Sequence, residues 1–121
     1  MSWFEIPVIN FDKALKFYEE VFQIKMHEMQ INGINGQWGF FPFDPTEGGI
    51  GGGIVKSNGY VPSQKGTLVY LNGGDDLSVP LMRIEKAGGK IILAKTPIGE
   101  NGFMALFMDT EGNKVGLHST S

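Results

Sequence analysis

The chain has no cysteine, no long apolar run and no block of charges of one sign. Without cysteine it can form no disulfide, carries no thiolate nucleophile and offers no cysteine ligand to zinc. No segment approaches the roughly 18 consecutive apolar residues of a membrane span, and the first residues lack the basic and apolar leader of a signal peptide. These absences predict a cytoplasmic protein that does not bind a membrane.

The charged residues are nearly balanced, with 13 acidic and 10 basic side chains and a formal net charge of -3. They are spread along the chain, so no basic surface for nucleic acid is expected. The length of 121 residues suits one domain with a core of its own. Glycine is frequent, at 18 residues, but without a fixed period, which excludes a collagen-like repeat and indicates turns and close backbone approaches.

The first unit of secondary structure begins with an alternating segment. Apolar residues alternate with other residue types over 3–8, which predicts a half-buried strand. Asn10 suits the N-cap of a helix, and apolar residues at three- and four-residue spacing predict that helix over 11–22. Three further strands are predicted over residues 24–30, 37–43 and 50–55. The order is therefore β, α, β, β, β.

The helix over residues 11–22 is predicted to bury one stripe of side chains. This stripe is defined by Leu15, Tyr18 and Phe22. Phe17 and Glu20 are expected to face away from it.

The same order returns after a polar linker over residues 57–65. A strand is predicted over 67–72, followed by a helix capped by Asp76 and ended by the glycine pair 88–89. The buried residues of this helix are expected to be Leu77, Leu81, Ile84 and Ala87, and the remaining strands to cover 90–94, 103–109 and 114–118. Consecutive strands with short turns favour antiparallel pairing, so the fold class is α+β, with one domain built from units 1–56 and 66–121.

Each helix should cover one face of its sheet, which leaves the opposite faces to form a cleft. Strand alternation places seven candidates there: Trp3, Gly53, Tyr70, Asn72 and Gly116 for substrate binding, and Glu5 and His118 for catalysis. A carboxylate in an apolar strand suits acid/base chemistry, and an imidazole can accept or donate a proton near neutral pH. The alternative for Glu5 is a hydrogen bond to a neighbour or a dimer contact, and for His118 a solvated position near the chain end.

Five segments carry a resemblance to a known family. Residues 4–8 (FEIPV) and 12–22 (DKALKFYEEVF), then 71–77 (LNGGDDL), 87–90 (AGGK) and 109–118 (DTEGNKVGLH), resemble the vicinal-oxygen-chelate superfamily in the same order. This superfamily includes glyoxalases, extradiol dioxygenases, epimerases, fosfomycin-modifying enzymes and bleomycin-binding proteins. The resemblance implies two βαβββ units that form a curled, eight-stranded mixed sheet around a cleft, often completed by dimerisation.

The resemblance also implies where a metal would bind. In the metal-using members, the first and last strands of each unit supply one ligand each, and the motifs align these positions with Glu5, Gly53, Tyr70 and Gly116. Only Glu5 is an ordinary ligand, whereas a catalytic divalent site normally needs about three. We therefore expect neither a metal nor another cofactor.

The leading hypothesis is a glyoxalase-like protein that binds a small molecule in the cleft without a metal, and whether it is an enzyme stays open. One alternative is a divalent-metal-dependent lyase or isomerase similar to lactoylglutathione lyase, in which Glu5, His118 and a partner-chain residue hold the cation. The other is a drug-sequestering protein with aromatic cleft walls. A homodimer is expected, with Trp38 and Phe41 covering exposed sheet surface, although Trp38 and Phe40 also suit a sheet core.

Overall fold

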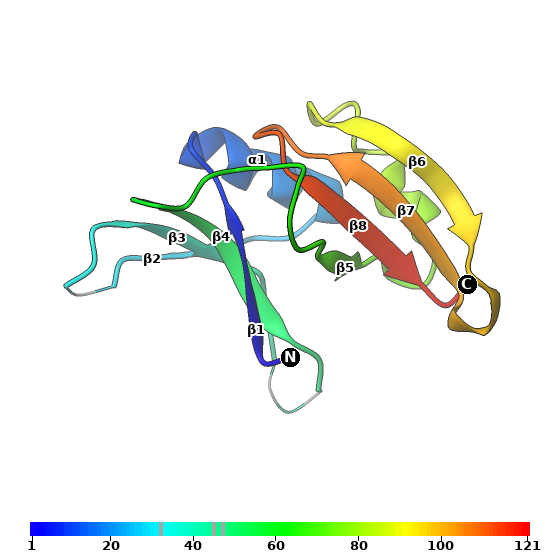
Figure 1. Cartoon of the computed structure of the whole chain (residues 1–121). Helices are drawn as coiled ribbons and strands as arrows, with labels where there is room; N and C mark the ends of the chain where they lie inside the picture. Colours follow the sequence, from blue (N-terminus) through cyan, green and yellow to red (C-terminus); the bar gives the residue numbers. More distant parts are fainter. Residues whose placement is uncertain (32, 45, 47) are drawn as a thin grey trace.

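The computed structural model describes all residues of 1–121 except 32, 45 and 47 and contains two four-stranded sheets (Figure 1). Along the chain the elements are β1 (Trp3–Pro7), α1 (Phe11–Phe22), β2 (His27–Met29), β3 (Gly36–Phe40), β4 (Gly51–Ser57), β5 (Tyr70–Asn72), α2 (Ser78–Leu81), β6 (Lys90–Pro97), the short 3-10 helix η2 (Gly99–Asn101), β7 (Phe103–Met108) and β8 (Lys114–Ser119). Within the described part of the chain, no helix is long and apolar enough to cross a membrane.

The two sheets repeat one strand order, β1-β4-β3-β2 and β5-β8-β7-β6. In each unit the strand that comes first along the chain, β1 or β5, pairs in parallel with the strand that comes last, β4 or β8. The other neighbouring strands are antiparallel. The predicted α+β class and the mixed sheets are confirmed. The eight strands form two sheets, and no strand pairing within the described residues joins them. β5 pairs with β8 over only three residues, so it offers little edge to a further strand.

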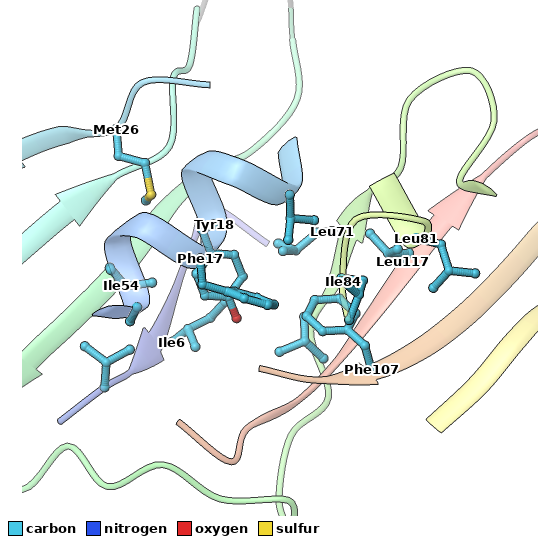
Figure 2. Close-up of a cluster of buried hydrophobic side chains, with 14 of the residues drawn as sticks. Ile6, Phe17, Tyr18, Met26, Ile54, Leu71, Leu81, Ile84, Phe107 and Leu117 are labelled. Carbon is cyan, nitrogen blue, oxygen red and sulfur yellow. The ribbon is translucent and has the colours of Figure 1, made fainter. Parts of the chain in front are cut away.

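Helix α1 has the predicted bounds and cap. The Asn10 side chain accepts a hydrogen bond from the backbone N–H of Lys13 at 3.2 Å, and the helix ends at Gln23 in a left-handed conformation. The expectation that Phe17 faces away from the core is wrong, because this side chain is 1% exposed. Phe17 lies against Tyr18 and against Phe107 of β7, so α1 contacts both sheets and buries a wider face than one stripe (Figure 2).

The second predicted helix is much shorter than expected. Helix α2 contains four residues, and the chain then continues in turns closed by hydrogen bonds between residues three apart, from Arg83 to Pro80 and from Ile84 to Leu81. The Asp76 side chain accepts a hydrogen bond from the backbone N–H of Ser78. The prediction that Asp76 caps this helix is wrong, because the N-cap is Leu77, which makes no side-chain cap. Leu77, Leu81 and Ile84 are nevertheless buried as predicted.

One hydrophobic core is shared by both units. It contains Ile6 and Ile54 from the first sheet, Phe17 and Tyr18 from α1, and residues of α2 and the second sheet such as Leu81, Phe107 and Leu117 (Figure 2). The side chains that alternate with these core positions leave the other face of each sheet available for function.

The turn between β7 and β8 joins the units through buried hydrogen bonds. The Tyr18 hydroxyl donates to Asp109 Oδ2 at 2.7 Å, and Asn113 Nδ2 donates to the same oxygen and to the Pro7 carbonyl. The Asp109 carboxylate also accepts from the backbone N–H groups of Glu111 and Asn113. Burial, followed by the charge of Asp109 beside it, raises the pKa of Tyr18 well above its usual value. This cluster fixes the first unit to the second.

Candidate functional site

The open face of the first sheet carries Trp3 and Glu5 on β1 and Phe40 on β3. The strand register places Glu5, Gly53 and Phe40 in one row across β1, β4 and β3. Trp3 lies one row away and meets Phe40 edge to face, with ring centres 5.3 Å apart. Since the central residue of the row is glycine, no side chain separates Glu5 from Phe40.

The Glu5 carboxylate accepts hydrogen bonds from two aromatic side chains. The Trp3 indole donates to Oε2 at 3.4 Å, and the Tyr60 hydroxyl donates to Oε1 at 3.1 Å. Tyr60 comes from the predicted linker, and a turn closed by its backbone N–H to Ser57 holds it in place. The hydrogen bond to Glu5 and the charge of Glu5 raise the pKa of Tyr60. The sequence pattern could not identify Tyr60 as a site residue, because linker residues show no periodic alternation.

The open face of the second sheet brings together Tyr70, Asn72, Gly116 and His118. Tyr70 pairs with Gly116, and Asn72 with His118, across β5 and β8. His118 Nε2 donates to the Asn101 carbonyl at 2.6 Å, so the imidazole is tied to η2. A cavity of about 550 Å³ is lined by Tyr70, Asn72 and His118. Glu5 lines a separate cavity of about 120 Å³, and the two catalytic candidates therefore do not meet in this chain.

The four positions that the family motif assigns to metal ligands are neighbours in the register, Glu5 beside Gly53 and Tyr70 beside Gly116. Two of them are glycines, which offer a metal no side chain. A Cβ at Gly53 would lie 2.3 Å from the Gly39 carbonyl oxygen, and a Cβ at Gly116 would lie 2.4 Å from the Tyr70 ring. A ligand side chain could enter neither position without movement of its neighbours. Among the described residues, no group of three or more His, Asp or Glu side chains is placed to hold a metal ion.

Aromatic rings cover glycines on both sheets. A Cβ at Gly51 would lie 2.8 Å from the Trp3 indole, and the Tyr70 ring covers Gly116 in the same way. Trp3 is 43% exposed and Tyr70 is 44% exposed, so each ring presents one surface to solvent. Of the four motif positions, Gly116 is thus covered by an aromatic ring, whereas Trp3 covers Gly51, one row away from Gly53.

A larger cavity, of about 630 Å³, lies between the sheets and is called here the inter-sheet cavity. Residues of β1, the end of α1, the segment after β3, and β5 contribute to its wall, including Phe4, Phe22, Phe41, Tyr70 and Asn72. Of the predicted site residues only Tyr70 and Asn72 line it. The sequence did not identify Phe4, Phe22 and Phe41 as site residues, because their spacing is that of core residues. They reach one cavity through the tertiary packing of β1, the end of α1 and the segment after β3.

The whole chain is similar in fold to several solved structures. A mutant of glyoxalase I from Zea mays superposes with a TM-score of 0.71 at 19% identity; the match covers 98% of this chain and 46% of that one, so this chain spans less than half of the maize enzyme. A glyoxalase/bleomycin resistance protein from Streptomyces sp. CB03234 gives a TM-score of 0.69 at 22% identity over 98% of both chains. An antibiotic-binding protein from the same organism gives 0.64 at 23% identity over 100% of this chain and 95% of that one.

Sequence comparison identifies the family. A search of curated proteins found no match to this sequence. The family model of the Glyoxalase/Bleomycin resistance protein/Dioxygenase superfamily matches residues 1–117, which confirms the resemblance carried by the sequence motifs. The chain belongs to this superfamily.

Proposed function

We propose that this protein binds a small, flat and mainly apolar molecule in the inter-sheet cavity, without a metal at the four inherited positions. The observation that carries the proposal is the cavity itself, whose volume of about 630 Å³ is that of a small-molecule site. Sites of this kind combine apolar walls with a few polar groups that orient the ligand. The inter-sheet cavity has both.

The apolar wall is an array of aromatic rings. Phe41 lies with its ring centre 5.8 Å from that of Phe4 and 6.3 Å from that of Phe22. Aromatic side chains supply large apolar areas with little conformational freedom to lose. A flat ring system is the ligand shape that such a wall contacts best.

The polar groups favour a hydrogen-bond acceptor on the ligand. Asn72 Oδ1 accepts from the backbone N–H of Gly74 at 2.9 Å, which leaves the amide N–H groups as donors with no partner among the described residues. Asp44 at the edge of the cavity accepts two hydrogen bonds from Thr46, and these lower the pKa of its carboxyl group. The ionised carboxylate disfavours an anion, so the ligand class is neutral or cationic.

Binding without turnover is supported by the same features. The fold of an antibiotic-binding protein is similar to that of this chain, and the Tyr70 ring covers the motif position Gly116. The alternative, a metal-dependent lyase or isomerase, needs several protein ligands around one ion. Glu5 and His118 have separate hydrogen-bond partners and line separate cavities.

Nile red, a neutral flat dye with a carbonyl acceptor, is a suitable probe. Its fluorescence should rise on titration with the protein, and EDTA should leave the curve unchanged. Asn72→Ala and Tyr70→Ala should each weaken binding about three- to tenfold, since each removes one contact worth about 1 kcal/mol. The controls are Asn58→Ala and Met82→Ala, two exposed residues outside the cavity lining. No saturable binding by the unaltered protein, or equal losses in test and control variants, would contradict the proposal.

We also infer that two copies of the chain associate through strand edges. Trp38 is 4% exposed within one chain and leaves no surface for a partner. Ile92 and Leu93 on the edge strand β6 are exposed, and such an edge invites pairing. Sedimentation velocity at high micromolar concentration should find a dimer that Leu93→Lys weakens and Met82→Lys does not. A monomer under these conditions would contradict this inference.

A further inference from the structure

The face of the first sheet carries a cluster that the inter-sheet cavity does not include. It consists of Glu5, Trp3, Phe40 and Tyr60, and is called here the Glu5 cluster. None of the three aromatic residues lines the inter-sheet cavity, and neither does Glu5. A ligand at this cluster would therefore contact residues that do not line the inter-sheet cavity.

The Glu5 cluster places a negative charge among aromatic rings. One carboxylate oxygen accepts from the Trp3 indole at 3.4 Å and the other from the Tyr60 hydroxyl at 3.1 Å. An ionised carboxylate has about four acceptor sites, so two remain after these bonds. In the described part of the chain the ion pair within 4 Å joins Lys95 to Asp76, and no cation is paired with Glu5.

The aromatic members present surface to an approaching ligand. Trp3 is 43% exposed and Tyr60 is 37% exposed, and they hold opposite oxygens of one carboxylate. Phe40 backs Trp3 edge to face, with ring centres 5.3 Å apart, which fixes the indole. The faces of Trp and Tyr attract cations through the negative potential of their rings.

We propose that the Glu5 cluster binds a small organic cation, of the alkylammonium or quaternary ammonium class. The carboxylate supplies the opposite charge, while the indole and phenol supply faces that suit methyl or methylene groups next to a positive nitrogen. A bare metal ion is disfavoured, since the indole donates a proton and Glu5 is the single carboxylate ligand of the cluster.

Two nearby lysines repel a bound cation, and this repulsion provides a further test. Lys65 and Lys114 line the small cavity beside Glu5, although neither lies within ion-pair distance of it. Lys65 is exposed, so solvent and salt screen most of its repulsion. Removing this charge by Lys65→Ala should therefore strengthen cation binding modestly, by about twofold.

The experiment compares two probes of the same shape at constant ionic strength. Choline carries a quaternary nitrogen, and 3,3-dimethylbutan-1-ol carries a neutral carbon in its place. Titration followed by ¹H–¹⁵N NMR should move the indole N–H signal of Trp3 with choline, with a dissociation constant in the millimolar range, while the signal of the buried Trp38 stays fixed. The neutral alcohol should move neither signal. Equal shifts with both probes would overturn the proposal, because shape alone would then explain binding.

Two conservative variants test the named groups. Glu5→Gln keeps the side-chain shape and removes the charge, and should weaken choline binding by at least about fivefold. Tyr60→Phe keeps the ring and removes the hydroxyl, and should weaken it by about twofold. Unchanged affinity in Glu5→Gln would overturn the proposal. Since Nile red reports on the inter-sheet cavity and choline on the Glu5 cluster, failure of one probe leaves the result with the other unaffected.

Discussion

The two units of this chain build the same four-stranded sheet but cover it with different helices. In the first unit α1 has 12 residues, a side-chain cap and an uninterrupted register. In the second unit α2 has four residues and the chain continues in turns as far as Gly88. Both segments still bury their apolar residues in one shared core. The comparison shows that the core depends on apolar spacing, which a helix and a series of turns can both supply.

The open faces of the sheets differ in a related way. The first holds a carboxylate between aromatic donors, and the second holds a tyrosine over a glycine next to a histidine tied to Asn101. In each pair of motif positions one residue carries a side chain, Glu5 or Tyr70, and the other is glycine. Both pairs of motif positions thus contain one glycine, while the side chains around them differ.

The largest expected effect concerns the helix that joins the units. Phe17→Ala should lower the free energy of unfolding by about 3–5 kcal/mol, because a large side chain in contact with both units leaves a cavity. The half-buried Leu15→Ala should cost about 1–2 kcal/mol, and Glu20→Ala less than about 0.5 kcal/mol. Urea unfolding checks the series. Equal losses for Leu15 and Phe17 would mean that α1 does not pack against the second sheet.

A smaller loss is expected from the polar connection between the units. Asp109→Ala removes the acceptor for the Tyr18 hydroxyl and for two backbone N–H groups, and should cost about 2–4 kcal/mol. The control is Asp12→Ala on the exposed side of α1. Thermal unfolding should also become less cooperative, since the units lose their buried connection. An unchanged midpoint would show that the turn closes without this carboxylate.

The smallest of the three effects is a dependence on alkaline pH. The folded-state pKa of Tyr18 is raised above the unfolded value of about 10, so its contribution to stability is complete below pH 10 and is lost as pH rises toward the folded pKa. Between pH 10 and 11 the unaltered protein should lose about 1 kcal/mol more than Tyr18→Phe. Other titrating groups cancel in the difference. Parallel stability curves for the two proteins would contradict the raised pKa.

Much of the fold could be predicted from the sequence because its signals are local. The alternation over 3–8, the cap at Asn10 and the turn over 109–113 each depend on a few neighbouring residues, and each is found in the structure. The burial of Phe17 could not be predicted, because it depends on contact with β7, whose position follows from the packing of the second unit. The separation into two sheets is likewise a tertiary property.

The candidate site was less accessible to prediction. Strand parity correctly grouped Trp3 with Glu5 and Tyr70 with Gly116, because side chains alternate across a strand. Parity carries no information about the linker that brings Tyr60 to Glu5, or about the ends of α1 and β3 that bring Phe22 and Phe41 to the inter-sheet cavity. These residues depend on connections whose paths are set by long-range packing.

Metal content tests the central claim, that the four motif positions hold no catalytic metal. Elemental analysis of the purified protein should find well under one equivalent of zinc, iron, manganese or nickel per chain. The reason is that Glu5 alone cannot hold a divalent ion, two of the other positions are glycine, and tyrosine is an uncommon ligand. Stoichiometric metal that is lost on replacing Glu5 or His118 would contradict the claim and favour a metal-dependent lyase or isomerase.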